Sequence, residues 1–443
     1  MSDLRQVVDQ GPMRGFQWVA IAVCVVLNMI DGFDVLVMAF TASSVTAEWE
    51  LSGGELGMLL SAGLLGMALG SLFIAPWADR IGRRPLILLC LVLSGTGMVL
   101  SSLSQSPTQL AWLRGVTGLG IGGILASSNV IASEYASTRW RGLAVSLQST
   151  GYALGATLGG LLAVWLLSHW GWRSVFLTGG LITFAAIALV LPWLPESLDF
   201  LLSKQPRHAL QRVNALAARL RQPGLAALPA RPAQATESNG NAVLRLFTPS
   251  LLRGTLLIWL LFFLVMFGFY FIMSWTPKLL TSSGLSVQQG VTGGVLLSIG
   301  GIFGATLLGL LSARFALPRV LAAFMLITAL LLLLFTGIGS SYLAALGMGL
   351  LIGLFSNGCV AGLYALSPLL YGASIRATGV GWAIGIGRGG AILSPTVAGL
   401  MLDGGWQPLE LYGWFALVFV VAALFLLLLL PARRAARLTP SQA

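Results

Sequence analysis

Charged residues are scarce in this chain of 443 residues: Asp, Glu, Lys and Arg make up 9% of it, against about 25% in ordinary soluble domains. Cysteine and histidine are rarer still, with three and two copies. The cysteines, Cys24, Cys90 and Cys359, lie far apart in apolar runs, while His169 and His208 fall in expected loops. These patterns indicate neither a disulfide framework nor a metal site, and we expect no cofactor.

The chain is rich in long apolar runs. It is 57% hydrophobic, with a mean hydropathy of +0.89. A bilayer-spanning helix needs about 20 apolar residues, and we expect twelve such spans, roughly at 16–40, 54–78, 85–103, 108–134, 142–168, 173–194, 251–280, 288–312, 319–337, 343–370, 378–402 and 411–431. The first run is too long for a signal peptide and lacks a small-residue cleavage site, so it is expected to remain as a helix. The sequence therefore predicts an all-α membrane protein.

A polar, basic segment at 195–250 separates the sixth expected span from the seventh. It has the composition of a short amphipathic helix followed by a flexible Pro- and Ala-rich linker. We therefore expect an N-terminal six-helix bundle at 1–194, a cytoplasmic linker at 195–250, and a C-terminal six-helix bundle with a short cytoplasmic tail at 251–443.

The two halves repeat one another. The segment 70–85 is similar to 304–319, which aligns Arg80 with Arg314. Parallel repeats of this kind are typical of transporters that rock around a substrate site between their halves. The sequence therefore predicts two pseudo-symmetric bundles.

Basic residues set the expected orientation. If the N-terminus lies inside, all but four of them fall on the cytoplasmic side, the exceptions being Arg114, Arg173, Lys278 and Arg388. This agrees with the positive-inside rule and places both termini in the cytoplasm. The formal net charge of +11 then reflects topology, so we expect the bilayer as a partner and no nucleic acid. We expect a monomer in the inner (cytoplasmic) membrane of a bacterium.

Several motifs resemble those of the major facilitator superfamily. Residues 79–85, 114–120 and 195–197 are similar to its signatures in the loop after helix 2, in helix 4 and at the end of helix 6. More narrowly, residues 31–34 and 376–388 resemble the helix 1 and helix 11 regions of the aromatic acid:proton symporters. The resemblance covers the whole chain and implies a twelve-helix transporter.

Two acids in the first span are the most unusual feature. Asp31 and Asp34 are three residues apart and share a helix face. A charge at the bilayer centre costs about 2.5–3.5 kcal/mol, so an acid there is a functional hypothesis by default. Two like charges cannot both ionise easily at low dielectric, and the pair is therefore a plausible proton carrier.

Arg114 is expected at the depth of these acids. It lies about 9 Å into its helix from the outer end, and Asp34 lies about 27 Å along the first span. We expect Arg114 to pair with Asp34 or Asp31 and to take part in proton coupling. The alternative is a fixed structural ion pair.

Arg388 lies near mid-depth in the eleventh span, where the second half offers no acid. Its planar guanidinium suits a carboxylate, so we expect it to bind an anionic substrate. The alternative is that backbone carbonyls or an acid of the first half satisfy it. Other candidate substrate-binding residues, each of which could instead pack helices together or lie at the membrane interface, are Tyr270, Trp275, Asn129, Gln148 and Asn357.

A charged cluster is expected at the cytoplasmic face. The superfamily resemblance implies an inner latch of Asp79, Arg80 and Glu134, and the wider set of candidate gate residues adds Arg84, Arg141 and Arg376. The alternative is topology alone, which would suffice for Arg83 and Arg84. The second-half copy of the loop has Ala313 in place of an acid, so the gate is expected to be lopsided.

The expected function is import of a small aromatic carboxylate together with a proton, by alternating access. The proton would be carried on Asp31 and Asp34, and the anion would be held by Arg388. Alternatives are a proton-driven efflux antiporter, an importer of a related acid such as nicotinate or muconate, and a membrane sensor. An enzyme is not expected, because no nucleophile–base arrangement is apparent.

Overall fold

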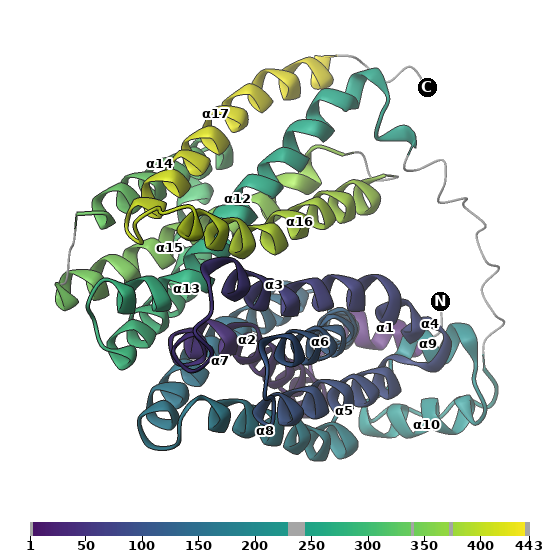
Figure 1. Ribbon diagram of the computed structural model, residues 1–443. Coiled ribbons are helices and arrows are strands. Elements are labelled where there is room, and N and C mark those ends of the chain that lie inside the picture. The colour runs from purple at the N-terminus through teal and green to yellow at the C-terminus, as the bar shows by residue number, and fades with distance from the viewer. Residues whose placement is uncertain (1–2, 229–243, 338–340, 372–374, 439–443) are drawn as a thin grey trace. The chain divides into compact units, whose positions relative to one another are not determined.

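The computed structural model describes residues 3–228, 244–337, 341–371 and 375–438 (Figure 1). Every regular element in these ranges is a helix, so the predicted all-α fold class is confirmed. Part of the predicted flexible linker, including Arg231, and the end of the predicted tail lie outside the described residues.

Contacts divide the chain into two compact units. Unit 1 contains the described residues up to Val35, Leu65–Gly159, and those from Trp172 to residue 228. Unit 2 contains Leu36–Leu64, Gly160–Gly171 and the described residues from 244 onward. The helices α2, α3 and α7 contribute to both units. The division into six-span halves stays a prediction.

The elements of the first part of the chain are α1 (Asp3–Gln10), α2 (Gly15–Trp49), α3 (Gly53–Leu69), η1 (Gly70–Ile74), η2 (Ala75–Trp77), α4 (Ala78–Ile81), α5 (Arg83–Ser102), α6 (Pro107–Tyr135), α7 (Arg141–Trp170), α8 (Trp172–Trp193), α9 (Leu198–Lys204) and α10 (Ala209–Arg219). Those of the second part are α12 (Pro249–Ser282), α13 (Val287–Arg314), α14 (Leu317–Phe335), α15 (Tyr342–Leu366), η3 (Ser367–Leu369), α16 (Arg376–Asp403) and α17 (Glu410–Leu438).

Eleven of the described helical stretches are long and apolar enough to cross a membrane. They coincide with the spans expected from the sequence except for 378–402, which lies in α16. This helix is rich in glycine and contains Arg388, and both features lower its mean hydropathy.

Local sequence signals start several of the spans. Ser106 caps α6 by accepting a hydrogen bond from the Gln109 amide at 3.3 Å, and Pro107 follows as the first helical residue. The capping box at the start of α13 uses Ser286 and Gln289. These caps satisfy amides that have no partner inside their own helix.

One apolar core joins most of unit 1. Buried side chains of α1, α2, α5, α6, α8, α9 and α10 belong to a single cluster. The contributions of α10 are Val213, Leu216 and Ala217, so this short helix is fixed to the membrane-spanning helices by its apolar face (Figure 1).

In unit 2, α12 packs against α16 and α17, and α13 packs against α15. The start of α3 is joined to the end of α16, because the Asp403 carboxylate accepts the amide hydrogens of Gly53 and Gly54 at 2.6 and 2.7 Å. Negative charge at a helix N-terminus is stabilising. This contact helps to hold the first turns of α3 in unit 2.

All three cysteines are buried. Cys24, Cys90 and Cys359 each have 0% of their surface exposed, and none forms a disulfide.

Candidate transport site

The acid pair of α2 lies in the interior of unit 1. Asp31 and Asp34 are 2% and 1% exposed. Their carboxyl oxygens accept no hydrogen bond from the residues that the structure describes. A buried carboxylate without partners is unfavourable, and binding a proton removes its charge. This environment suits a group that gains and loses a proton.

Close backbone packing holds this part of α2 against α7. A Cβ atom added at Gly32 would overlap the main-chain oxygen of Tyr152, and one added at Gly155 would overlap that of Met29. The amide of Asn28 also donates to the main-chain oxygen of Gln148. Side chains larger than glycine would therefore separate the two helices beside the acids.

Arg114 of α6 reaches the same level as Asp34. Its Nη2 donates to the main-chain oxygen of Asp34 at 2.6 Å, and its Nη1 contacts the Met98 sulfur at 3.4 Å. The guanidinium carbon lies 5.9 Å from the centre of the Phe176 ring. Arg114 is thus held by a peptide oxygen and by soft, polarisable groups. Its pairing with a carboxylate stays a prediction.

The two acids have different neighbours. Asp34 interacts electrostatically with Arg114, whereas Asp31 interacts with Asp34 and with Cys90 of α5. Asp34 is thus the acid with a cation beside it. The spacing of Asp31 and Asp34 in the sequence could not show that their neighbours differ.

The second basic centre lies in unit 2. Arg388 of α16 is half-buried and interacts electrostatically with Tyr270 of α12 and Tyr364 of α15. A Cβ atom added at the preceding Gly387 would lie 3.2 Å from side-chain atoms of Phe262 and Met266, so α16 approaches α12 closely here. The structure thus gathers one guanidinium and two phenol groups from three helices.

Each of these two tyrosines packs against a phenylalanine ring. Tyr364 packs edge-on against Phe262, with ring centres 5.6 Å apart, and Tyr270 packs against Phe269 at 5.5 Å. Tyr364 is not among the binding residues predicted from the sequence. It could have been predicted, because it is a tyrosine inside an apolar span, as Tyr270 is.

Three of the other predicted binding residues contact neighbouring groups of the protein. Trp275 is buried and donates its indole N–H to the Pro395 oxygen at 3.0 Å, which ties α12 to α16. Gln148 is buried and donates to the Ser128 hydroxyl at 3.0 Å. Asn357 is half-buried and lies close to Gly301. The fourth, Asn129 of α6, is exposed. Their predicted contact with substrate stays a prediction.

The cytoplasmic charges expected in the first half form a network in unit 1, and its centre is Arg83. This side chain contacts Asp79 at 3.5 Å, Glu134 at 3.9 Å and the Ser197 hydroxyl at 3.2 Å. The positive-inside rule alone would suffice to explain Arg83, yet its side chain contacts residues from three different parts of the chain. Since Asp79 is largely exposed, its pair with Arg83 contributes little to stability.

Glu196 organises the backbone beside Arg83. Its Oε1 accepts hydrogen bonds from the amides of Arg83, Arg84 and Ser197 at 2.8, 3.2 and 2.8 Å. Gly82 precedes α5 with φ of +101°, and an added Cβ there would overlap the Glu196 carboxylate. Glu196 therefore caps α5 from a distant part of the chain, a role that its position in the sequence did not reveal.

The remaining predicted gate residues differ in their contacts. Arg141 pairs with Asp9 of α1 at 2.6 Å. Arg80 is exposed and forms no hydrogen bond or ion pair with any described residue. In unit 2, Arg376 donates from Nε to the main-chain oxygen of Tyr371 at 3.4 Å. In the described ranges, no three His, Cys, Asp or Glu side chains are grouped as metal ligands.

Residues 21–316 match the family model described as Major Facilitator Superfamily. The chain is a member of the major facilitator superfamily and therefore a multi-pass membrane transporter rather than an enzyme. It is 34% identical to a gallate transporter of Pseudomonas putida over 430 residues, covering 96% of this chain and 94% of that one. It is also 32% identical to a 4-hydroxybenzoate transporter of Pseudomonas aeruginosa over 408 residues, covering 91% and 90%.

The narrower resemblance is thereby confirmed, since these relatives are aromatic acid transporters. Among solved structures, a bacterial homologue of the human lysosomal transporter Spinster is 19% identical, with a TM-score of 0.72, and covers 97% of this chain and 100% of its own. A xylose transporter from Escherichia coli is 16% identical, with a TM-score of 0.71 and coverage of 93% and 97%. These two likenesses support the fold.

Proposed function

We propose that this protein imports a small aromatic carboxylate together with a proton. The observation that carries the proposal is the pair of buried, unbonded carboxyl groups of Asp31 and Asp34 in the described part of α2. A permanent charge there is costly in an apolar interior, so a proton would bind and leave as the surroundings change.

The anion would bind at Arg388. Its guanidinium can donate two parallel hydrogen bonds to a carboxylate. Tyr270 and Tyr364 would contribute hydroxyl groups and ring faces beside it. The names of the relatives, which include transporters of gallate, 4-hydroxybenzoate and 3-(3-hydroxyphenyl)propionate, support a carboxylate joined to an aromatic ring.

Loading both ligands would neutralise both sites. Asp31 and Asp34 would carry the proton as a pair, and Arg114, bonded to the peptide oxygen of Asp34, would couple the pair to α6. Entry of one proton with one monoanion moves no net charge, so the pH gradient would drive uptake.

The topology belongs to the same proposal. Both termini would lie in the cytoplasm of a bacterium, and the protein would act in the inner membrane as a monomer. The predicted gate residues are Asp79, Arg80, Arg84, Glu134 and Arg141 of unit 1 and Arg376 of unit 2. The network centred on Arg83 supports a stable cytoplasmic end in unit 1.

Uptake into proteoliposomes tests this function. We would supply labelled gallate, 4-hydroxybenzoate, benzoate and nicotinate from outside, with the interior more alkaline. At least one acid should accumulate, and a protonophore should abolish its accumulation. Expulsion of preloaded acid under the same gradient would instead support the efflux antiporter, and binding without accumulation would support a sensor.

A further inference from the structure

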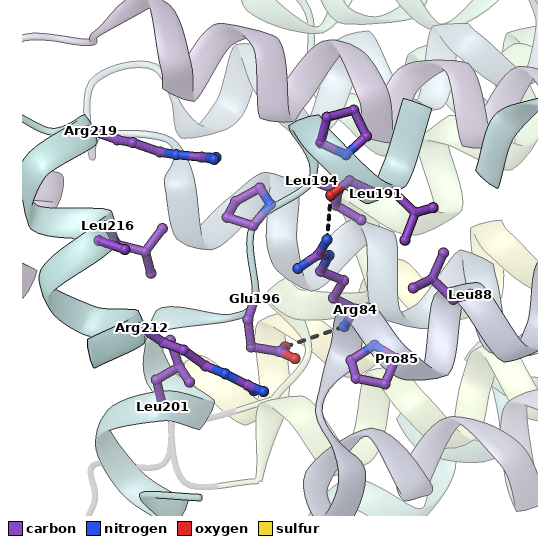
Figure 2. A pocket seen from close by; sticks show the side chains of 13 residues that line it. Arg84, Pro85, Leu88, Leu191, Leu194, Glu196, Leu201, Arg212, Leu216 and Arg219 are labelled. Atoms are coloured by element: carbon purple, nitrogen blue, oxygen red, sulfur yellow. Dashed lines mark hydrogen bonds between the residues drawn. The ribbon is translucent and has the colours of Figure 1, made fainter. Parts of the chain in front are cut away.

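A pocket of about 400 Å³ lies in unit 1, and its lining includes neither Asp31 nor Asp34. Its walls come from the first turns of α5, the end of α8 and the face of α10 (Figure 2). Cavities of roughly 300–1,000 Å³ are the usual size for small-molecule sites. This space is therefore large enough for a compact polar group.

Three arginines give the pocket a positive charge. Arg84 lies at the start of α5, and Arg212 and Arg219 are seven residues apart on one face of α10. In Figure 2 the side chains of Arg212 and Arg219 extend from α10 toward the side where Arg84 and Glu196 lie. The pocket thus presents cations from two separate helices.

The single acid in the wall does not cancel this charge. One oxygen of Glu196 already accepts three main-chain amides at the start of α5 and at Ser197. Arg84 donates to the main-chain oxygen of Leu191, and its Nε has no partner in the described ranges (Figure 2). Arg212 and Arg219 form no ion pair with any described acid, although Arg219 lies 5.1 Å from the centre of the Phe16 ring.

The other lining residues are mainly apolar, among them Leu88, Leu191 and Leu216. Leu191 lies in a membrane-spanning helix and is 53% exposed, as expected for a side chain that faces lipid. Nearby, the exposed Trp193 is the last residue of α8. Exposed leucine followed by tryptophan at the end of a span is typical of the boundary between hydrocarbon and headgroups.

We propose that this pocket binds the headgroup of an anionic phospholipid. The phosphodiester would accept hydrogen bonds from Arg212, Arg219 and Arg84, and an acyl chain would lie along Leu191 and Leu88. Basic pockets at the cytoplasmic ends of spans suit such headgroups. The packing of α10, the short helix after the last predicted span of the first half, would then depend on the lipid composition of the membrane.

Native mass spectrometry of the purified full chain tests the proposal. The probes are phosphatidylglycerol and phosphatidylcholine, each titrated separately, and inorganic phosphate, which is added as a competitor to the lipid. Phosphatidylglycerol should bind with one high-affinity stoichiometric site, and phosphatidylcholine should bind at least fivefold more weakly. Equal binding of the two lipids, or full competition by equimolar inorganic phosphate, would overturn the proposal.

Variants locate the site. The double variant Arg212→Gln/Arg219→Gln should weaken phosphatidylglycerol binding at least fivefold. The matched control, Lys204→Gln/Arg207→Gln, removes the same charge from exposed positions outside the pocket and should bind as the parent does. Should the double variant fold poorly, Arg212→Gln alone leaves the Arg219–Phe16 contact intact and should still weaken binding about threefold. Unchanged affinity in a folded variant, or an equal loss in the control, would refute the site.

Discussion

Arg114 and Arg388 are both arginines inside membrane-spanning helices, but their surroundings differ. Arg114 is 2% exposed and is fixed by the peptide oxygen of Asp34 and the sulfur of Met98. Arg388 is half-buried and interacts electrostatically with Tyr270 and Tyr364. In the proposed mechanism, the fixed Arg114 would respond to the charge of the acid beside it. The more accessible Arg388 would bind the external anion.

The first way to test this contrast is to remove the titratable group beside Arg114. Asp34→Asn keeps the shape of the side chain but cannot exchange a proton near neutral pH. Accumulation driven by the pH gradient should fall about tenfold or more, while exchange of substrate for substrate should persist, since exchange needs no net proton movement. Uptake of labelled acid and counterflow would be measured in parallel.

The control for this variant is Glu50→Gln, which removes an exposed acid that forms no ion pair with any described residue. It should leave accumulation within about twofold of the parent, because an exposed charge without a close partner contributes little to the folded structure. Full gradient-driven accumulation by Asp34→Asn would contradict its role as proton carrier.

At Arg388 the expected effect is on substrate affinity. Arg388→Lys keeps the charge but loses the planar fork, so KM for the transported acid should rise about tenfold, the change that corresponds to roughly 1.4 kcal/mol. The thermal midpoint of the unliganded protein should fall less than it does for the same substitution at Arg114, because Arg388 is less deeply buried. An unaltered KM would exclude Arg388 from the binding site.

The same substitution at Arg114 should have the opposite profile. Arg114→Lys disturbs the bond to the Asp34 peptide oxygen in a buried site, at a cost of about 1–3 kcal/mol. A lower thermal midpoint is therefore expected, measured by thermal shift in detergent. If both lysine variants lowered only the midpoint, or both raised only KM, the distinction between the two arginines would be lost.

The smallest expected effect is at the phenol beside Arg388. Tyr364→Phe removes one hydroxyl and keeps the ring that packs on Phe262. One lost neutral hydrogen bond corresponds to about 0.5–1.5 kcal/mol, so KM should rise roughly two- to tenfold for hydroxylated aromatic acids. The control is Tyr342→Phe, which changes a tyrosine at the start of α15. Equal effects of the two variants would argue against a role for Tyr364.

The sequence predicted the features that depend on one helix at a time. Apolar length located the spans, and the spacing of Asp31 and Asp34 placed both acids in one span. Depth along the helix also put Arg114 level with Asp34, and the structure has them in contact. That the bond goes to the peptide oxygen could not be predicted, because it depends on how α2 and α6 are rotated about their own axes.

Features that need several helices were less accessible. Trp275 stays a predicted substrate-binding residue, but the bond of its indole N–H to the main-chain oxygen of Pro395 on another helix was not predicted. Arg83 was explicable by the positive-inside rule, yet it links Asp79, Glu134 and Ser197. The pocket beside α10 depends on a short helix after the last span of the first half returning to the ends of α5 and α8. Such contacts arise from tertiary packing, for which neither periodicity nor charge count is informative.

The burial of the three cysteines makes the natural chain a favourable background for spectroscopic labelling. A maleimide reacts with accessible thiolates, so Cys24, Cys90 and Cys359 should label slowly in the folded protein. A cysteine introduced at an exposed loop position outside the spans, such as Gln105 in unit 1 or Gln407 in unit 2, would then carry the dye selectively. With one dye in each unit, single-molecule energy transfer could follow the transport cycle in a chain whose 14 tryptophans make its intrinsic fluorescence hard to assign.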